Sequence, residues 1–396
     1  RSNRNKFGPR SIQEPWAARK AGLKESFSNQ DDNHVPKFKR LNGDGQLKPL
    51  SLKAALDKMK SSSSAGLPFL CKKGKATAKL MEAFDSYLER ADPCMLYTRT
   101  QEGRKTRNVW GYPFADTLWE MRFYAPILWI QKEKYYRAAI VSPECVEERI
   151  TEIIQYARST GRVIVSIDFK AFDASVKWQY IRAAFEYFAS CFGPMYAVFL
   201  REIGERIHSI GIVTPEAVYR GNHGVPSGST FTNEVDSVVQ LMIALTNDFI
   251  DEIRCQIQGD DGVYAMFKQE VAKFYSSFAY AGLKVEESKS SVSSDYAIFC
   301  QNLYHIDYID DGVIHGIYPT YRALNRILFQ ERYVNFASSG IKGSDYYGIR
   351  CLSILENCKY HPLFEELVRF VLVREKYNLD VSDDGLTAYL RVLGLN

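Results

Sequence analysis

Four aspartates stand at positions of the sequence where their carboxylates could meet. Asp168 follows residues 162–167, a short apolar run rich in β-branched side chains that predicts a buried strand. Asp173 lies five residues further on, and Asp260 and Asp261 occupy a Gly-Asp-Asp-Gly run between two more apolar segments, which predicts a hairpin tip. If that hairpin pairs beside the first strand, Asp168 and Asp260 converge. Their oxygens could then hold two Mg²⁺ ions, or Mn²⁺, roughly 4 Å apart, which activate an attacking hydroxyl and neutralise a leaving group.

A loop of small residues, 224–233, lies between these aspartates and leads into a strongly apolar helical stretch. Small residues let a backbone approach a substrate closely, and the start of a helix offers free amides. The side chains of Ser227, Thr232 and Asn233 could then bind a sugar. Each feature alone has a simpler interpretation: a plain turn, a helix N-cap at Asp173, or a loop that only caps the next helix. Their order along one chain favours a catalytic site.

These motifs resemble those of a known family. In chain order, the segments similar to motifs A, B and C of viral RNA-dependent RNA polymerases are Asp168-x4-Asp173, Ser227-Gly228-x4-Asn233 and Gly259-Asp260-Asp261. The B loop and the Trp-Gly-Tyr-Pro tetrapeptide at 110–113 are most similar to the picobirnavirus and partitivirus group, and picobirnaviruses are favoured. The resemblance implies template-directed synthesis of RNA from ribonucleoside triphosphates, for replication and transcription of a viral genome.

Weaker resemblances extend the coverage to about residues 61–305. They comprise motif G, which guides the template (Ser64-Ala65-Gly66); the basic motif F beside the incoming nucleotide (Arg104-Lys105-Thr106-Arg107); motif D (282–289); and the motif E hairpin (298–301). Motif D departs from the family pattern because the spacing from its glycine is not clean. Its lysine, a general acid for the pyrophosphate, is Lys284 or Lys289, and we favour Lys289.

The resemblance also implies a role for each matched residue. Asp168 and Asp260 would be the principal ligands of two Mg²⁺ ions, with Asp261 as a weaker partner. Asp173 and Asn233 would bind the ribose 2′-hydroxyl, which distinguishes RNA from DNA precursors. The remaining nucleotide-binding positions are Ser227, Gly228, Thr232, Lys105 and Arg107, the last two for the triphosphate. The basic cluster could equally be a solvated loop, and both motif D lysines could be plain exposed residues.

The bulk composition is that of an ordinary globular protein, with 46% hydrophobic and 25% charged residues among 396. Residues 1–110 carry 23 Lys and Arg against 11 Asp and Glu, whereas the whole chain is only +4, so the remainder is net −8. This asymmetry suits a first part that meets a polyanion and a later part that holds cations. A solvated basic surface would look the same.

Cysteine spacing and hydropathy exclude some classes. The eight cysteines are scattered without a C-x-x-C pair, which argues against a zinc site or a disulfide framework and for reduced thiols. No apolar run reaches the roughly 18 residues that span a bilayer, and the first ten residues lack the apolar core of a secretory signal. We therefore expect neither a membrane anchor nor export.

The order of elements predicts an α+β fold in which helices back an antiparallel sheet. We expect a loop-rich arm over 1–62 with a short helix near 50–60, helices at 76–90, 117–133 and 144–159, two helices over 177–208 broken at 193–194, and a long helix over 229–251. The resemblance adds a right-hand polymerase architecture. Fingers and arm would occupy 1–162, the palm 163–305 with a helical fingers insertion at about 178–222, and a mostly helical thumb 306–396.

Template RNA, nascent RNA and ribonucleoside triphosphates are the partners that this family implies, together with a viral capsid protein, in the virion interior and the host cytoplasm. Two other classes of protein remain open. A reverse transcriptase uses aspartates in similar places, but we would expect it to carry a bulky side chain near the incoming sugar. A non-catalytic RNA-binding or capsid-associated protein would explain the basic first part but not the convergent aspartates. The mode of initiation does not follow from the sequence.

Overall fold

The computed structural model describes residues 8–9, 12–28, 33–330, 336, 340–374, 376 and 379–393. Its central element is a four-stranded sheet in the order β10-β3-β8-β7, with every neighbouring pair antiparallel. The strands are β3 (Val163–Ile167), β7 (Cys255–Gln258), β8 (Asp261–Met266) and β10 (Ser291–Ser293). The predicted strand, hairpin and antiparallel pairing are confirmed.

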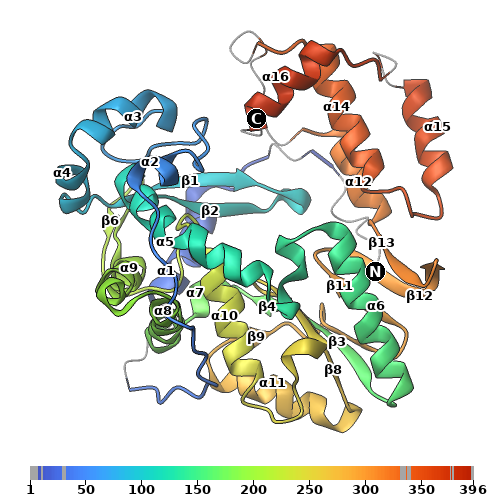
Figure 1. Ribbon diagram of the computed structural model, residues 1–396. Helices are drawn as coiled ribbons and strands as arrows, with labels where there is room; N and C mark the ends of the chain where they lie inside the picture. Colours follow the sequence, from blue (N-terminus) through green and yellow to red (C-terminus); the bar gives the residue numbers. More distant parts are fainter. Residues whose placement is uncertain are drawn as a thin grey trace.

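Helices cover both faces of this sheet, because side chains alternate between the faces along each strand. Ile164 and Val263 point into a core that α6 (Pro143–Ser159) covers. Val165 and Tyr264 point the other way, into the main core. The helices of that core are α5 (Phe114–Lys132), α8 (Trp178–Cys191), α9 (Ala197–Ser209), α10 (Thr232–Ala244) and α11 (Val271–Tyr280). Figure 1 shows α6 on one side of the sheet and α10 and α11 on the other.

A second sheet belongs mostly to the first part of the chain. Its strand order is β2-β1-β5-β6, and β1 and β2 form a long antiparallel hairpin. The bounds are β1 (Cys94–Thr100), β2 (Thr106–Gly111), β5 (Ile212–Val213) and β6 (Val218–Tyr219). Short helices pack nearby: α1 (Trp16–Ser28), α2 (Leu52–Leu56), α3 (Lys73–Glu82) and α4 (Phe84–Glu89). The tip of the hairpin points towards the C-terminal helices (Figure 1).

The last part of the chain combines a three-stranded sheet with helices. The strands are β11 (Tyr296–Phe299), β12 (Asn302–Asp310) and β13 (Val313–Ile317), all antiparallel. The helices are α12 (Thr320–Leu328), α14 (Gly343–Glu356), α15 (Phe364–Arg374) and α16 (Asp383–Leu393). A two-stranded ribbon of β4 (Phe169–Lys170) and β9 (Lys284–Val285) joins the segment after Asp168 to the segment before Lys289. The short helix α7 (Phe172–Ser175) follows β4.

Several boundaries differ from the sequence predictions. The helix predicted over 229–251 ends at Ala244, where the Asn247 side chain donates to the Ala244 carbonyl. The helix predicted over 76–90 is interrupted at Ala83, whose φ of −140° is not helical. The helix α1 and the hairpin β1–β2 were not predicted. Among the described residues no helix is both long and apolar enough to span a bilayer, and all eight cysteines are free thiols.

Candidate functional site

The strand register brings the aspartates of the first and third motifs together. Ile167 of β3 pairs with Gly262 of β8, so Asp168 leaves its strand beside the start of β8. Gln258 and Asp261 pair across the hairpin, leaving Gly259 and Asp260 as its two-residue turn. The first residue of such a turn often needs a positive φ, and Gly259 has φ +63°. The convergence predicted from sequence is therefore present in the fold.

The turn is held from behind by side chains of α10. The Gly259 amide donates to Ser237 Oγ at 2.8 Å, and Gln240 Nε2 donates to the Gly259 carbonyl at 2.8 Å. Tyr264 fixes Gln240 in turn, because its hydroxyl donates to Gln240 Oε1 at 2.6 Å. Ser237 and Gln240 are buried. Hydrogen bonds thus hold both the amide and the carbonyl of Gly259, the residue before Asp260.

A buried ion pair extends this support. The Arg137 guanidinium binds the Glu234 carboxylate, and both side chains are fully buried. Arg137 also donates to Ser237 Oγ, to the Ile257 carbonyl at 3.1 Å and to Gln258 Oε1 at 3.1 Å. One guanidinium therefore joins α10 to the strand that leads into the turn. No sequence motif marked Arg137.

Several carboxylates lie close together at the β7–β8 turn. Burial raises the pKa of Asp168, Lys289 opposes that rise, and Asp260 adds to it. Burial also raises the pKa of Asp261 to about 7, with the charges of Asp260 and Asp168 adding to the rise. Lys289 Nζ lies 3.6 Å from Asp168 Oδ1, and its charge lowers the pKa of Asp168 more than the charge of Asp260 raises it.

This carboxylate cluster suits divalent cations, since hard oxygen donors with surplus negative charge are what Mg²⁺ prefers. Within the described ranges, no three Asp, Glu, His or Cys side chains lie close enough to form a metal site on their own. Mg²⁺ commonly takes only one or two carboxylates and completes its shell with water and substrate phosphates. The residues therefore fit ions that bind together with a nucleotide.

Asp173 lies beneath the site with an acidic partner. A hydrogen bond joins it to Asp236 of α10, whose side chain is 3% exposed. Burial raises the pKa of Asp173 to about 6 and that of Asp236 well above its usual range, and Asp260 adds to both shifts. Asp236 is thus the protonated member and donates to the Asp173 carboxylate.

The small-residue loop, 224–233, lies against β2 and against the segment that carries Asp173. The Val225 amide donates to the Asp173 carbonyl at 2.7 Å. A Cβ on Gly228 would lie 1.6 Å from the Trp110 carbonyl oxygen, so only glycine lets the loop meet β2 here. The Trp110 amide donates to Ser227 Oγ at 3.4 Å. The loop therefore joins β2 to the segment that carries Asp173.

The end of the loop is fixed by its own hydroxyls and by one buried acid. Thr232 Oγ1 donates to the carbonyls of Pro226 and Ser229. The Glu120 carboxylate of α5 accepts from Ser229 Oγ at 3.0 Å and from the Thr230 amide at 2.7 Å. Burial raises the pKa of Glu120 to about 7. Glu120 carries no signal in the sequence, because burial of a helical carboxylate is a tertiary property.

Basic side chains predicted to bind phosphates approach the aspartates. The pKa of Lys105 is lowered by burial and by the charges of Arg107 and Lys289, whereas Asp168 raises it. The charge of Arg107 lowers the pKa of Asp173. The charges of Lys105, Arg107 and Lys289 thus act on Asp168 or Asp173, whereas Lys284, on β9, is exposed and its backbone pairs with Lys170.

The structure also gives the surroundings of Asn233 and of the predicted template segment. Asn233 Nδ2 donates to Glu234 Oε1 at 3.5 Å, and its Oδ1 faces Gly259 of the catalytic turn. Asp236, one turn further along α10, is the residue of this helix that is hydrogen-bonded to Asp173. In the template segment Ala65 is fully buried and Gly66 packs on the Tyr112 carbonyl, so only the exposed Ser64 presents a side chain.

Comparison with known proteins identifies the class. The family described as viral RNA-dependent RNA polymerase matches residues 10–307. The chain belongs to this family. The potential RNA-dependent RNA polymerase of Human picobirnavirus (strain Human/Thailand/Hy005102/-) is 28% identical over 417 residues, which cover 96% of this chain and 77% of that protein. The RNA-directed RNA polymerase of Cryptosporidium parvum virus 1 (strain KSU-1) is 26% identical over 199 residues, 46% of this chain and 37% of that one.

Solved structures agree with this assignment. The crystal structure of the RNA-dependent RNA polymerase of a human picobirnavirus has a TM-score of 0.81 at 25% identity, covering 98% of this chain and 79% of that one. Its insertion loop deletion mutant has a TM-score of 0.84 at 26% identity, covering 98% and 82%. The polymerase is therefore of the picobirnavirus group, has a polymerase fold, and catalyses RNA-directed RNA synthesis from nucleotide substrates.

Proposed function

We propose that the polymerase transfers nucleotides at the junction of β3 and the β7–β8 turn. Asp168 and Asp260 would hold two Mg²⁺ ions, or Mn²⁺, with Asp261 as a weaker partner. The observation that carries this proposal is the register of Ile167 with Gly262, which sets Asp168 beside the turn. The bound ions would lower the pKa of the attacking 3′-hydroxyl and neutralise the leaving pyrophosphate.

The protein's own groups position the nucleotide. Lys105 and Arg107 would bind its triphosphate, since both approach the aspartates from β2 and its preceding turn. Lys289, beside Asp168, would deliver a proton to the pyrophosphate. The loop residues Ser227, Gly228 and Thr232 would keep the backbone close to the sugar.

The ribose is the substrate group that Asp173 would recognise. Its carboxylate, which Asp236 holds by a hydrogen bond, is an acceptor for a 2′-hydroxyl, and Asn233, one turn before Asp236 on α10, would bind the same hydroxyl. The position of Asn233 is supported by its amide oxygen, which faces Gly259 of the catalytic turn. Comparing ribo- with deoxyribonucleotide incorporation tests the assignment. Asp173→Ala should reduce the preference for ribonucleotides, and an unchanged preference would contradict it.

The lobes follow from these positions. We assign the fingers and N-terminal arm to 1–162, the palm to 163–305 with the helical insertion at about 178–222, and the thumb to 306–396. This division is supported by the central sheet, which places Asp168 after β3, Asp260 in the β7–β8 turn and Asp261 at the start of β8, and by the mostly helical last part of the chain. Template RNA would pass Ser64, and the nascent strand would leave beside the thumb. A viral capsid protein would be a partner in the virion interior, with the host cytoplasm as the second location.

The decisive experiment replaces Asp260 with alanine. Template-directed incorporation on a defined RNA should fall below detection, while RNA binding, measured by fluorescence anisotropy, stays close to the wild-type value. Asp307→Ala removes an exposed carboxylate of β12 and serves as the matched control, with synthesis unchanged. Synthesis that survives in Asp260→Ala would overturn the metal assignment.

A further inference from the structure

The tip of the β1–β2 hairpin meets α12 through an unusual ion cluster. Glu102 lies in the turn between the two strands, and its Oε1 lies 3.7 Å from both Arg322 Nε and Arg326 Nε. The two arginines follow each other by one helical turn, so they present neighbouring guanidiniums on one face of α12. Figure 1 shows the hairpin reaching from the first part of the chain towards this helix.

The cluster is electrostatically paired but not hydrogen-bonded. Charge-assisted N–H···O bonds are usually about 2.7–2.9 Å long, and a separation of 3.7 Å is too great for one. Glu102 Oε1 and both Nε atoms are buried and make no hydrogen bond among the described residues. Buried charged groups that lack such bonds are costly. One carboxylate oxygen therefore serves two guanidiniums poorly, whereas an anion with more oxygens would satisfy both.

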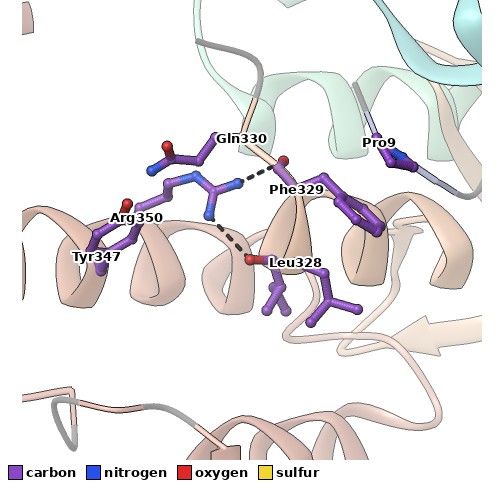
Figure 2. A pocket seen from close by; sticks show the side chains of 7 residues that line it. Pro9, Leu328, Phe329, Gln330, Tyr347 and Arg350 are labelled. Carbon is purple, nitrogen blue, oxygen red and sulfur yellow. Dashed lines mark hydrogen bonds between the residues drawn. The ribbon is translucent and has the colours of Figure 1, made fainter. Parts of the chain in front are cut away.

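The surroundings of α12 hold these arginines in place. Arg350 of α14 donates to the carbonyls of Arg326, Ile327 and Phe329, which are free at the end of the helix. Figure 2 shows its guanidinium directed at this end, beside a pocket of about 330 Å³. The pocket is lined by α12, α14 and Pro9 and by none of the catalytic aspartates.

The cluster also lies close to the catalytic turn. Arg322 is near enough for its charge to act on Asp261, in opposition to the larger effects of burial and of the other aspartates. Lys105, three residues after Glu102, is an electrostatic neighbour of Asp168. An RNA strand paired at the active site would therefore pass these guanidiniums with its phosphates.

We propose that Arg322 and Arg326 form a binding site for a phosphodiester of the RNA, and that Glu102 occupies this site when RNA is absent. The proposal rests on the active-site location given above. A phosphodiester offers two non-bridging oxygens to the two guanidiniums, where Glu102 offers one. RNA binding would displace Glu102 into solvent and free the hairpin tip that carries Lys105. The nucleotide triphosphate is a less suitable occupant, because Lys105, Arg107 and Lys289 already approach its position.

The test is the affinity for a primer–template RNA, measured by fluorescence anisotropy across a salt series without nucleotide or divalent metal. Arg322→Gln and Arg326→Gln should each weaken binding about tenfold, and each should reduce the slope of log affinity against log salt by about 1. Glu102→Gln should bind RNA several-fold more tightly than wild type, because the competing anion is gone. This opposite sign distinguishes an exchangeable anion from a structural bridge.

Control variants keep the outcome unambiguous. Arg201→Gln and Glu186→Gln break an exposed ion pair between α8 and α9, on the opposite side of the molecule in Figure 1, and should leave both affinity and slope unchanged. Arg322→Lys preserves the charge and should retain the slope even if the guanidinium packing is lost. Weaker binding in Glu102→Gln, or arginine variants whose RNA affinity and salt slope equal those of the wild type, would overturn the proposal. Because catalysis is not measured, failure here is separate from failure of the Asp260 test.

Discussion

Removing the Arg137 guanidinium should loosen the catalytic turn more than any other part of the protein. In Arg137→Met the Glu234 carboxylate stays fully buried without its cation, and Ser237, Ile257 and Gln258 lose a donor. Breaking a buried ion pair from one side costs about 3–5 kcal/mol. At roughly 1.4 kcal/mol per factor of ten, local opening should become about 10²- to 10⁴-fold more frequent.

Hydrogen exchange followed by mass spectrometry can locate this change. Amides of α10 and the β7–β8 hairpin should exchange faster by that factor, while peptides from α3 and α15 keep their wild-type rates. Glu234→Gln should behave similarly, because it leaves Arg137 without its anion. The double variant Arg137→Met/Glu234→Gln should cost less than the sum of the two single variants, since neither charge then remains unpaired. Exchange within a few-fold of wild type, or fully additive costs, would refute the reasoning.

Three further predictions concern the site. Lys289→Arg should slow turnover and move the basic limb of the pH–rate profile upwards, since arginine holds its proton more tightly; an unchanged profile would exclude Lys289 as the acid. Burial raises the pKa of Glu120 from 4.5 to about 7, so folding stability should fall as pH rises through 7, by about 3 kcal/mol between pH 4 and 8. Thermal unfolding of Glu120→Gln should lack that component, and a wild-type pH dependence in the variant would contradict it. Gly228→Ala should abolish synthesis, because its Cβ would overlap the Trp110 carbonyl; primer extension by this variant at the wild-type rate would show that the loop does not need this contact.

The parts of the site that the sequence predicted rest on local signals. A β-branched run ending on Asp168 and a glycine-bounded turn at Asp260 mark a strand and a hairpin whatever surrounds them. Convergence of the two then needs only one strand pairing, which the fold provides. The glycines at 224 and 228 likewise indicate a close approach of the backbone, and the structure shows one at Gly228, where a Cβ would overlap the Trp110 carbonyl.

The remaining parts depend on tertiary contacts. Asp236 was not singled out from the sequence, and its contact with Asp173 depends on the rotation of α10 about its axis, which no local pattern sets. Glu120 and Arg137 resemble ordinary charged residues in sequence, and their burial arises from elements far along the chain. The helix α1 buries only Leu23 and Ser26, so its apolar periodicity is too weak to predict it.

The hydrogen bonds between α10 and the Gly259 turn have a consequence for the accuracy of nucleotide selection. The same helix carries Asp236, which touches the residue that would sense the sugar, and Ser237 and Gln240, which hold the turn of Asp260. If a nucleotide with the wrong sugar shifted α10, the shift would also displace the carboxylate of Asp260. Discrimination between sugars and alignment of the catalytic carboxylates would then depend on the same movement of α10. A nucleotide with the wrong sugar would displace the groups that would otherwise incorporate it.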